Sequence, residues 1–417
     1  MSSGPVSAGC GKVGGMVTGS MGERIAAYRR RKGLSQAALA QLVGRSESWL
    51  SQVERGLRSV DRLSVVLDMS RVLRVDVQAL IGRPWQYAPN GDPAVDGLGE
   101  VRRFFTRYDH LLGVEPPPAV SLQELRSSIA LAHSTYQAAR YEDVITQLPD
   151  VLGAVEGVHR RPAGDRREVL LGYVSAYVVA AKLLTKVGAT DLAMLAGDRA
   201  AFAAAEVDSA TARGMAAYQV ACALSRAERS DEAEHIAVTM AEQLGAGAKS
   251  DRPMQISLAG ALWLIAAVIA ARRTDRGDAW ERLDRADQLA GLLGEDANHA
   301  WTAFGPTNVL LHRVSVATEL GDAGEALRVA ADVDPAELPD GLASRRAQVH
   351  LDLAWAQAQR KRDAEATLHL LEAERTAPEA VRYNVIVREL VREMLARAGR
   401  TQTSALSDLA ARSGVID

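Results

Sequence analysis

A regularly spaced aspartate is the feature that most constrains how this 417-residue chain can fold. Each of these aspartates follows a short polar or glycine-containing turn and precedes an alanine-rich segment; they are Asp143, Asp191, Asp231, Asp278, Asp322 and Asp363. Their spacings of 48, 40, 47, 44 and 41 residues each leave room for two helices and two turns. An aspartate suits a helix start because its carboxylate accepts hydrogen bonds from unpaired backbone N–H groups, so we interpret each as an N-cap. The pattern predicts an array of helical hairpins over residues 120–417.

The class of repeat follows from the period and the turn chemistry. The period is longer than that of tetratricopeptide repeats, so the units resemble elongated, degenerate members of that class, and HEAT-like spacing fits about as well. The turn Gly321-Asp322 followed by Ala326 favours the tetratricopeptide interpretation. Apolar residues recur every three or four positions and aromatic residues make up only 5% of the chain, which disfavours a β-sandwich. The predicted fold class is all-α, with the C-terminal part forming a superhelical array of tetratricopeptide-like hairpins.

Charge divides the chain into parts with different roles. The formal net charge is -3, but residues 21–85 carry +6, residues 1–20 carry +1 and residues 86–417 carry -10. The segment between Pro84 and Pro93 is rich in proline and turn-forming residues and is typical of a linker. We therefore expect a disordered tail (1–20), a small basic domain (21–83), a linker with a short amphipathic helix over Val101 to Leu112 (84–119), and the array (120–417). A basic domain on an acidic body indicates that only the first meets nucleic acid.

The basic domain contains two short helices joined by a tight turn. Ser35 is placed to cap a helix that ends at Leu42, and Ser46 is placed to cap a second helix over Glu47 to Arg55. Between them Gly44 is free to adopt a positive φ. The expected core of a five-helix domain comprises Ile25, Tyr28, Leu39, Leu42, Leu50, Val53, Leu63, Val66, Leu67 and Leu73. Two helices with this connection predict a helix-turn-helix, which binds double-stranded DNA.

These residues resemble the Xre family of phage-repressor-like regulators. The resemblance covers about 60 residues and rests on four runs: Gly33-Leu34-Ser35-Gln36, Leu39-Ala40, Val43-Gly44 and Leu50 to Gly56. It implies that Gln36 bonds a phosphate, that the second helix enters the major groove, and that Arg29 and Glu54 form a structural pair tying the first helix to the recognition helix. It also implies a homodimer on an inverted-repeat operator, with half-sites one helical turn apart.

The predicted contacts with DNA divide by chemistry. Four exposed side chains of the second helix can read base edges: Glu47, Ser48, Ser51 and Gln52. Three arginines flank that helix and can neutralise phosphates: Arg45, Arg55 and Arg58. Trp49 stands where the family usually has a small residue. It either contacts a thymine methyl or the sugar backbone, or packs on the domain surface or on a partner.

The whole architecture resembles the peptide-pheromone regulators of Gram-positive bacteria, and the segments Phe304 to His312 and Ala373 to Glu379 resemble Xre regulators from high-GC Gram-positive bacteria. This implies that a small molecule, a peptide or a protein binds in the repeat groove. Asn308 is the first candidate, because an asparagine on such a helix clamps the ligand backbone in peptide receptors of this architecture. The further candidates for ligand binding are Tyr173, Tyr177, Tyr218, Trp263 and His312. Each could instead be a core residue.

Several function classes lack support in the sequence. Cys10 and Cys222 are too few for a disulfide framework or a four-ligand zinc site, the eight histidines are scattered, and no catalytic or nucleotide-binding motif occurs. The uncharged stretch Pro253 to Ala271 approaches membrane-spanning length, but a buried helix is the favoured interpretation. We therefore expect a cytoplasmic, ligand-responsive transcriptional regulator with no cofactor, no metal, no membrane partner and no enzymatic activity. The alternative is a DNA-tethered scaffold that recruits a partner protein.

Overall fold

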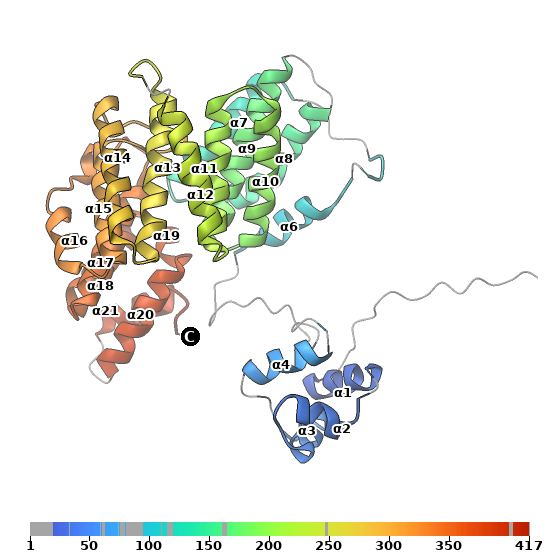
Figure 1. Ribbon diagram of the computed structural model, residues 1–417. Coiled ribbons are helices and arrows are strands. Elements are labelled where there is room, and N and C mark those ends of the chain that lie inside the picture. The colour runs from blue at the N-terminus through green and yellow to red at the C-terminus, as the bar shows by residue number, and fades with distance from the viewer. Residues whose placement is uncertain are drawn as a thin grey trace, which may run out of the picture. The chain divides into compact units, whose positions relative to one another are not determined.

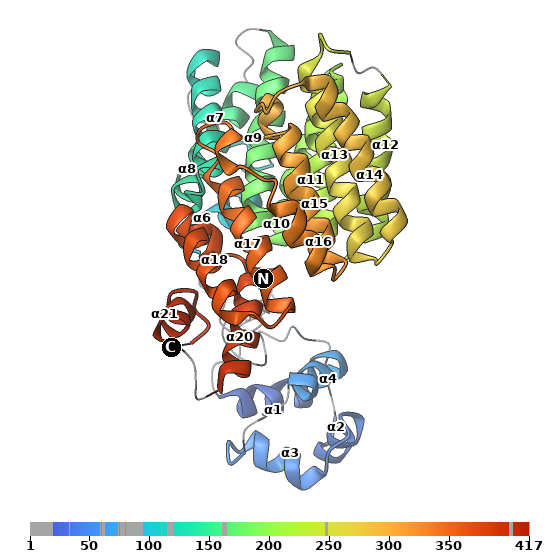
Figure 2. The ribbon, with the colours of Figure 1, turned by 90° about the vertical axis from the view of Figure 1, so that its left-hand side faces the viewer.

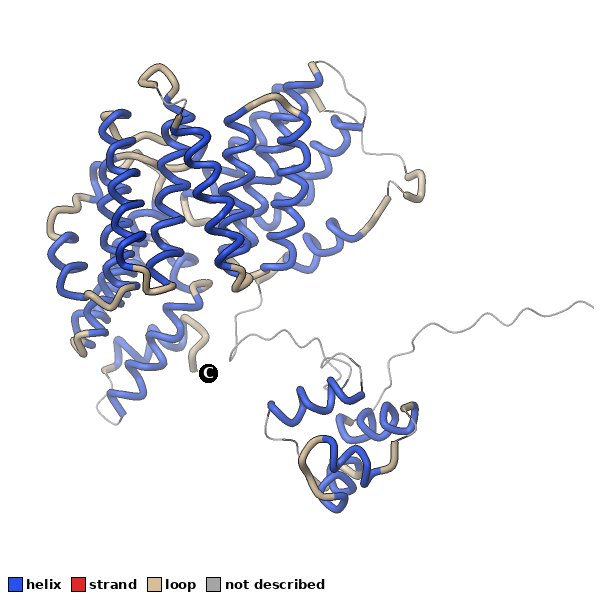
Figure 3. The backbone as a smooth tube through the Cα atoms, in the orientation of Figure 1, coloured by secondary structure: helices blue, strands red, loops and turns tan. Residues whose placement is uncertain are grey.

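The computed structural model describes residues 20–32, 34–58, 60, 63–73, 75, 80, 95–109, 111–114, 120–160, 165–246, 249–399 and 403–416. Contacts between Cα atoms divide the chain into two compact units, Met1–Asn90 and Gly91–Asp417, which we call the head and the body. Every regular element in the described part of both units is a helix, so the predicted all-α class is confirmed (Figure 3).

The head contains the predicted pair of helices between two others. They are α1 (Met21–Arg31), α2 (Gln36–Leu42), α3 (Glu47–Glu54) and α4 (Leu63–Leu73). Ser35 and Ser46 are N-caps as predicted, because their hydroxyl oxygens accept the backbone N–H of Ala38 and Trp49. Gly44 has φ = 64°, which closes the turn between α2 and α3. The expected fifth helix lies outside the described residues, apart from Leu80.

The head core forms where the four helices meet. It contains Ile25, Leu39, Ala40, Val43, Leu50, Val53, Val65, Val66, Met69, Leu73 and Leu80, with Tyr28 packed at its edge. The prediction of Leu42 as a core residue is wrong, because its side chain is 58% exposed. The inward positions of α2 are taken by Leu39 and Val43, four residues apart, and Leu42 falls beside that stripe. The side chains of Leu63 and Leu67 lie outside the described residues.

The body is built from antiparallel helix pairs that follow one another along the chain (Figure 1). The pairs are α7 (Leu122–Gln137) with α8 (Tyr141–Arg160), α9 (Arg166–Lys186) with α10 (Thr190–Glu206), α11 (Ala210–Arg226) with α12 (Ser230–Gly245), α13 (Pro253–Arg272) with α14 (Arg276–Leu293), α15 (Pro306–Glu319) with α16 (Ala323–Ala330), and α17 (Ala343–Gln359) with α18 (Asp363–Thr376). Two short 3-10 helices, η1 (His299–Trp301) and η2 (Pro335–Glu337), lie in the connections. The chain ends with α19 (Pro378–Arg382), α20 (Val385–Ala398) and α21 (Ser404–Arg412). One hairpin per aspartate interval is thus confirmed.

The repeated aspartates all lie at the start of the second helix of a pair, but only one caps it. Asp322 accepts the backbone N–H of Glu325 at 3.3 Å and is the N-cap of α16. The N-cap interpretation is wrong for the other five, which lie inside the first turn: Asp143, Asp191, Asp231, Asp278 and Asp363. In α14 the cap is Asp275 instead. A carboxylate inside the first turn still stabilises the helix through the partial positive charge of its N-terminus.

The short helix before the array belongs to the packing of the body. α6 (Leu98–Thr106) is shorter than the expected helix over Val101 to Leu112, because Leu111 and Leu112 are 72% and 75% exposed and have no apolar surface to cover. Phe104 and Phe105 are buried in the same core as α8, α9 and α10.

The body closes on itself, because its last helices pack against its first hairpin (Figure 2). At the start of α8 the Glu142 carboxylate accepts the Tyr383 hydroxyl at 2.5 Å and the Arg382 guanidinium at 3.1 Å. Its backbone N–H donates to the Glu379 carboxylate at 2.9 Å. One continuous apolar core contains residues from two groups of helices, the first running from α6 through α11 and the second from α17 through α21. The first helices of the hairpins therefore surround an interior space.

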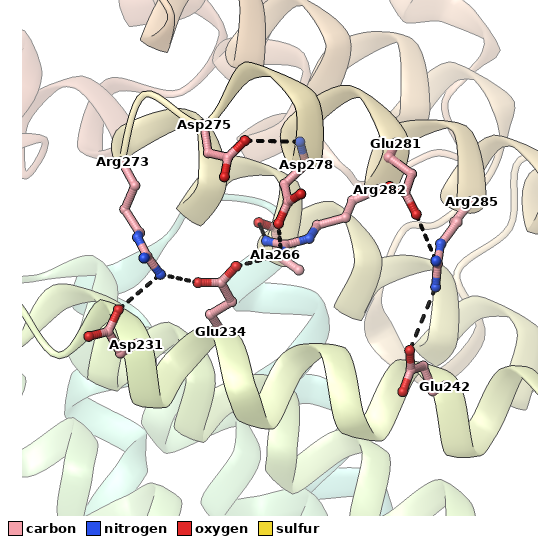
Figure 4. A network of polar contacts seen from close by, with 10 residues as sticks. All are labelled: Asp231, Glu234, Glu242, Ala266, Arg273, Asp275, Asp278, Glu281, Arg282 and Arg285. Carbon is pink, nitrogen blue, oxygen red and sulfur yellow. Dashed lines mark hydrogen bonds and ion pairs between the residues drawn. The ribbon is translucent and has the colours of Figure 1, made fainter.

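Ion pairs join α12 to the hairpin that follows it (Figure 4). The Arg282 guanidinium, which is 11% exposed, contacts Glu234 at 2.5 Å and Asp278 at 2.7 Å and donates to the Ala266 carbonyl at 3.0 Å. Arg273 also contacts Glu234. Because Glu234 lies on α12 and the arginines belong to the next hairpin, these contacts join two successive repeats.

Two helices of the body, α9 and α13, are long and apolar enough to cross a membrane. Within the apolar 18-residue segment of each helix, 61% and 83% respectively is buried inside the body. The expectation of a buried helix is confirmed for α13 by this packing. Gly260 makes the packing possible, since a Cβ at that position would lie 2.0 Å from the ring of Phe304.

Gly260→Ala is expected to destabilise the body by about 1–3 kcal/mol, because the Phe304 ring is itself fully buried and must move. Gly291→Ala on α14 is the matched control. Its Cβ would meet nothing within 4 Å, so the better helix propensity of alanine should stabilise the body by up to about 1 kcal/mol. Urea unfolding of both variants followed by circular dichroism measures the difference. Equal midpoints would contradict this account of the α13 packing.

Candidate DNA interface and interior channel

The recognition face of the head is the outer side of α3. Leu50 and Val53 turn inward and are buried, while Glu47 and Ser48 are exposed and Gln52 is partly exposed. Ser51, also partly exposed, lies beside them. This division follows from the helical period, which places the apolar and the polar positions of an eight-residue helix on opposite sides. The predicted base-reading side chains therefore share the solvent face of one helix.

Trp49 lies at the edge of this face and packs against the head core. The guanidinium carbon of Arg45 is 5.7 Å from the centre of its ring, which is cation–π distance. This placement supports the packing interpretation of Trp49 and orients Arg45 along the turn before α3. Arg55 and Arg58 are exposed at the other end of the helix.

Behind the recognition face, Glu54 joins three helices. Arg29 on α1 donates to both Glu54 carboxylate oxygens at 2.6 and 2.9 Å, and Gln36 on α2 donates its amide to the same carboxylate at 2.7 Å. The Arg29 and Glu54 side chains are only 12% and 6% exposed. The predicted structural role of this pair is confirmed, and the bond from Gln36 fixes that side chain at the N-terminus of α2.

Burial of the Glu54 carboxylate opposes its ionisation, but the hydrogen bonds from Arg29 and Gln36 outweigh burial and lower the pKa of Glu54 overall. A carboxylate with a lowered folded-state pKa contributes stability above its unfolded pKa. The head should therefore lose this contribution as the pH falls through the pKa of folded Glu54.

Two cavities meet in the interior of the body. One, of about 160 Å³, lies between α7, α9, α11, α17 and the residues around η1. The other, of about 180 Å³, lies between α9, α11, α15, α17 and α20. They share Lys186, Arg226, Arg345 and Gln348, so we treat them as one space and call it the interior channel. A third cavity of about 220 Å³ lies apart from it, between α6, α8, α9 and α10.

The six predicted ligand residues are not brought together. Tyr218 and His312 line the interior channel, and Tyr173 lines the separate third cavity. Burial lowers the pKa of His312 to about 3, so this ring is neutral at physiological pH. The other three, which line none of these cavities, are Tyr177, Trp263 and Asn308.

The packing of these three favours the core interpretation. Tyr177 is fully buried and donates to Glu156 at 2.6 Å, and Trp263 is 5% exposed beneath the Arg285 guanidinium. Asn308 is 1% exposed, although its side-chain oxygen has no hydrogen-bond partner in the described structure. The sequence places aromatic and amide groups on the first helices but does not show which side of each helix faces inward.

A strained loop forms one wall of the channel. Ala300, Trp301 and Ala303 have φ values of 50°, 60° and 53°, a region that non-glycine residues seldom adopt. The Trp301 ring stacks on His133 with a centroid distance of 4.7 Å, and Asn298 exchanges two side-chain hydrogen bonds with Gln137 at 2.9 Å. Contacts with α7 thus hold a loop that has no glycine in its strained positions.

Comparison with known proteins bears on the head. A family described as a helix-turn-helix domain matches residues 20–81. Residues 20–81 are a helix-turn-helix domain. The HTH-type transcriptional regulators SinR of Bacillus subtilis (strain 168) and of Bacillus licheniformis are each 38% identical to this chain over 61 residues. The match covers 15% of this chain and 55% of each SinR sequence. The chain therefore spans about half the length of the curated relatives it matches.

Two solved structures are similar over most of the length. Bacillus thuringiensis PlcR in complex with the peptide PapR7 and DNA has a TM-score of 0.33 at 10% identity, over 84% of this chain and 98% of that one. ComR from S. thermophilus in complex with DNA and its signalling peptide ComS has a TM-score of 0.29 at 14% identity, over 90% and 99%. The match to transcriptional regulators covers the helix-turn-helix domain alone and does not extend into the body.

The sequence reasoning missed the charged lining of the channel. Lys182, Lys186, Arg226 and Arg345 all line it, and they come from α9, α11 and α17. One local signal existed. Lys182 and Lys186 are four residues apart in an apolar helix, where like charges share a face and repel each other. Unlike the helix-turn-helix domain, this cluster has no contiguous motif.

Proposed function

We propose that the protein is a sequence-specific DNA-binding transcriptional regulator whose body binds a signal and thereby changes operator binding by a dimer. The observation that carries the proposal is the helix-turn-helix domain, whose α3 presents Glu47, Ser48, Ser51 and Gln52 on one polar face. Gln36 would bond a phosphate, and Arg45, Arg55 and Arg58 would neutralise others. Trp49 would support α3 from the edge of that face.

The charge distribution supports a division of labour. The net charge is +6 over residues 21–85 and -10 over residues 86–417, so phosphate attracts the first region and repels the second. The body would then serve dimerisation and sensing. A signal bound in its interior channel would favour one dimer arrangement over another and so change the spacing of the two heads. Tyr218 and His312 are the predicted ligand residues that remain in the channel.

Footprinting of bound DNA across the genome tests the DNA-binding part. The expected result is an inverted repeat whose half-sites lie one helical turn apart, about 34 Å, together with a dimer mass by light scattering at micromolar concentration. Fragments without a shared motif would contradict sequence-specific binding, and a monomer mass on the operator would contradict the dimer.

A second candidate function is a scaffold that recruits a partner protein while the helix-turn-helix domain holds it on DNA. Solenoid surfaces commonly bind peptides and protein segments. A partner that copurifies in fixed stoichiometry and binds the isolated operator complex would favour the scaffold. A small ligand that changes operator affinity without any partner favours the sensor.

A further inference from the structure

Four cationic side chains converge on the interior channel from helices far apart in the sequence. Lys182 and Lys186 lie one turn apart on α9, and Arg226 and Arg345 come from α11 and α17. Among the ion pairs of the described residues, none joins any of these four to a carboxylate within 4.0 Å. By contrast, Arg282, which does not line the channel, is paired with Glu234 and Asp278. The convergence is therefore not a network of internal ion pairs.

The two carboxylates that line the channel are already engaged. Glu319 is paired with Arg272 at 2.9 Å. Asp352 accepts hydrogen bonds from the Ser315 hydroxyl and, at 2.8 Å, from the Gln348 amide. Burial raises the pKa of Asp352 to about 6, against the opposite effect of its two hydrogen bonds and of Lys186. Neither carboxylate forms an ion pair with any of the four cations in the described structure.

Burial and the neighbouring arginines disfavour the charged forms of both lysines. Burial and the charge of Arg345 lower the pKa of Lys182 to about 7. Cys222 has a smaller effect, which raises this pKa. Burial, Arg226 and Arg345 lower the pKa of Lys186 to about 8, against a smaller opposing effect of Asp352. A lysine pKa this low means that the surroundings disfavour the charged ammonium form. Strongly shifted pKa values of this kind are characteristic of functional sites.

Neutral groups on the same wall also lack partners. The Tyr141 hydroxyl and the Thr185 hydroxyl both line the channel, are shielded from solvent, and have no hydrogen-bond partner in the described structure. The Lys182 ammonium donates one bond, to the Trp301 carbonyl at 2.8 Å, and has two further protons. A buried polar group without a partner costs free energy. A ligand with several acceptor oxygens could accept hydrogen bonds from the two hydroxyls and from the remaining N–H groups of the Lys182 ammonium.

We propose that the interior channel binds a small multivalent oxyanion, of the kind carried by phosphate monoesters and diphosphates. Several convergent cations suit two or more negative charges better than the single carboxylate at the end of a peptide. The two cavities of the channel, of about 160 and 180 Å³, are partly open to solvent, where Arg226 is exposed, and they have room for a small molecule rather than a folded partner. Binding itself is independent of DNA. The identification of this anion as the signal rests on the proposed function.

Isothermal titration of the full chain with pyrophosphate at constant ionic strength tests the site. We expect saturable binding that Lys186→Gln and Arg226→Gln each weaken by about 10-fold or more, because each removes a charge-assisted contact. Lys249→Gln makes the same change of charge on an exposed lysine of the body and should leave the affinity unchanged. Equal affinities for Lys186→Gln and Lys249→Gln would overturn the proposal, as would the absence of saturable binding to the wild type.

Thermal unfolding separates lost binding from misfolding. Removing one of several mutually repelling cations should raise the melting temperature of the unliganded body, while the further rise caused by pyrophosphate should disappear. A variant that melts earlier than the wild type and still responds to pyrophosphate would contradict the assigned role.

The pH dependence has a defined sign. Because the anion favours protonated Lys182 and Lys186, binding should take up protons near about pH 8, and affinity should fall as the pH rises through their pKa values of about 7 and about 8. Titrations in two buffers of different ionisation enthalpy measure the net proton exchange, to which the ionisation of pyrophosphate itself also contributes. Lys186→Gln should therefore take up fewer protons than Lys249→Gln, and equal values for the two variants would overturn the proposal.

Separate outcomes identify which inference fails. Pyrophosphate binding to the channel with no effect on operator affinity would uphold the anion site and contradict the sensor. An acidic peptide that changes operator affinity, in a chain that does not bind pyrophosphate, would uphold the sensor and overturn the anion site. Pyrophosphate is also attracted to the arginines of the helix-turn-helix domain. The comparison of Lys186→Gln with Lys249→Gln therefore decides whether the channel binds it, because both substitutions lie in the body and leave those arginines unchanged.

Discussion

Arg29→Met is expected to unfold the helix-turn-helix domain or leave it barely folded. The substitution removes both hydrogen bonds from the guanidinium to Glu54, whose side chain is only 6% exposed. Removing one partner of a buried ion pair costs about 3–5 kcal/mol, and only the Gln36 amide would remain bonded to the Glu54 carboxylate. A domain of about 60 residues has little stability to spare, so this loss removes most of it. Operator binding should disappear with the fold.

Hydrogen exchange of residues 20–73 in the full chain, measured by mass spectrometry, reports this loss without interference from the body. Arg71→Met is the matched control, because its pair with Asp68 is exposed at 76% and 45% and contributes little. The double variant Arg29→Met with Glu54→Leu should recover much of the protection, since an apolar pair can replace a buried ion pair. Equal protection in Arg29→Met and Arg71→Met would contradict this account.

Gln52→Ala is expected to weaken operator binding by about 10-fold or more, since a bidentate amide contact with a base contributes about 1–3 kcal/mol of discrimination. Gln52 lies on the partly exposed face of α3 and its removal leaves the head core intact. Binding to unrelated DNA and the salt dependence should stay the same, because no phosphate contact is lost.

Gln41→Ala, an exposed glutamine on α2, is the control for this experiment. Fluorescence anisotropy with operator and scrambled duplexes at one salt concentration gives both affinities. Operator affinities that match for Gln52→Ala and Gln41→Ala would show that Gln52 does not read the site. Arg55→Gln should weaken both duplexes alike and reduce the salt slope by about 1.

The helix-turn-helix domain could be predicted from the sequence because its signals are local. Ser35, Ser46 and Gly44 each act within a few residues of themselves, and the caps and turn occur where they were expected. The apolar pattern of the sequence predicts Leu42 in the core together with Leu39. On a seven-residue helix a rotation of one position is enough to expose it.

In the body the repeat length was predictable, but the inward direction of each side chain was not. The spacing of the aspartates fixed one hairpin per interval. The channel, however, depends on closure of the array through Glu142 and Tyr383, which are separated by most of the body sequence. Closure brings Arg345 opposite Lys182, and no local pattern reports that proximity. The strained loop at Trp301 is equally hidden, since its left-handed residues are not glycines.

Operator affinity with and without a saturated channel tests the central claim most directly. The operator identified by footprinting is titrated at constant ionic strength with the full chain, in pyrophosphate and in chloride, alongside Lys186→Gln and Lys249→Gln. A coupling of about 1–3 kcal/mol between the two sites predicts that pyrophosphate changes the operator Kd by about 5-fold or more in the wild type and in Lys249→Gln, but not in Lys186→Gln. An operator Kd that is the same with and without pyrophosphate, while titration shows the channel to be full, would contradict the account.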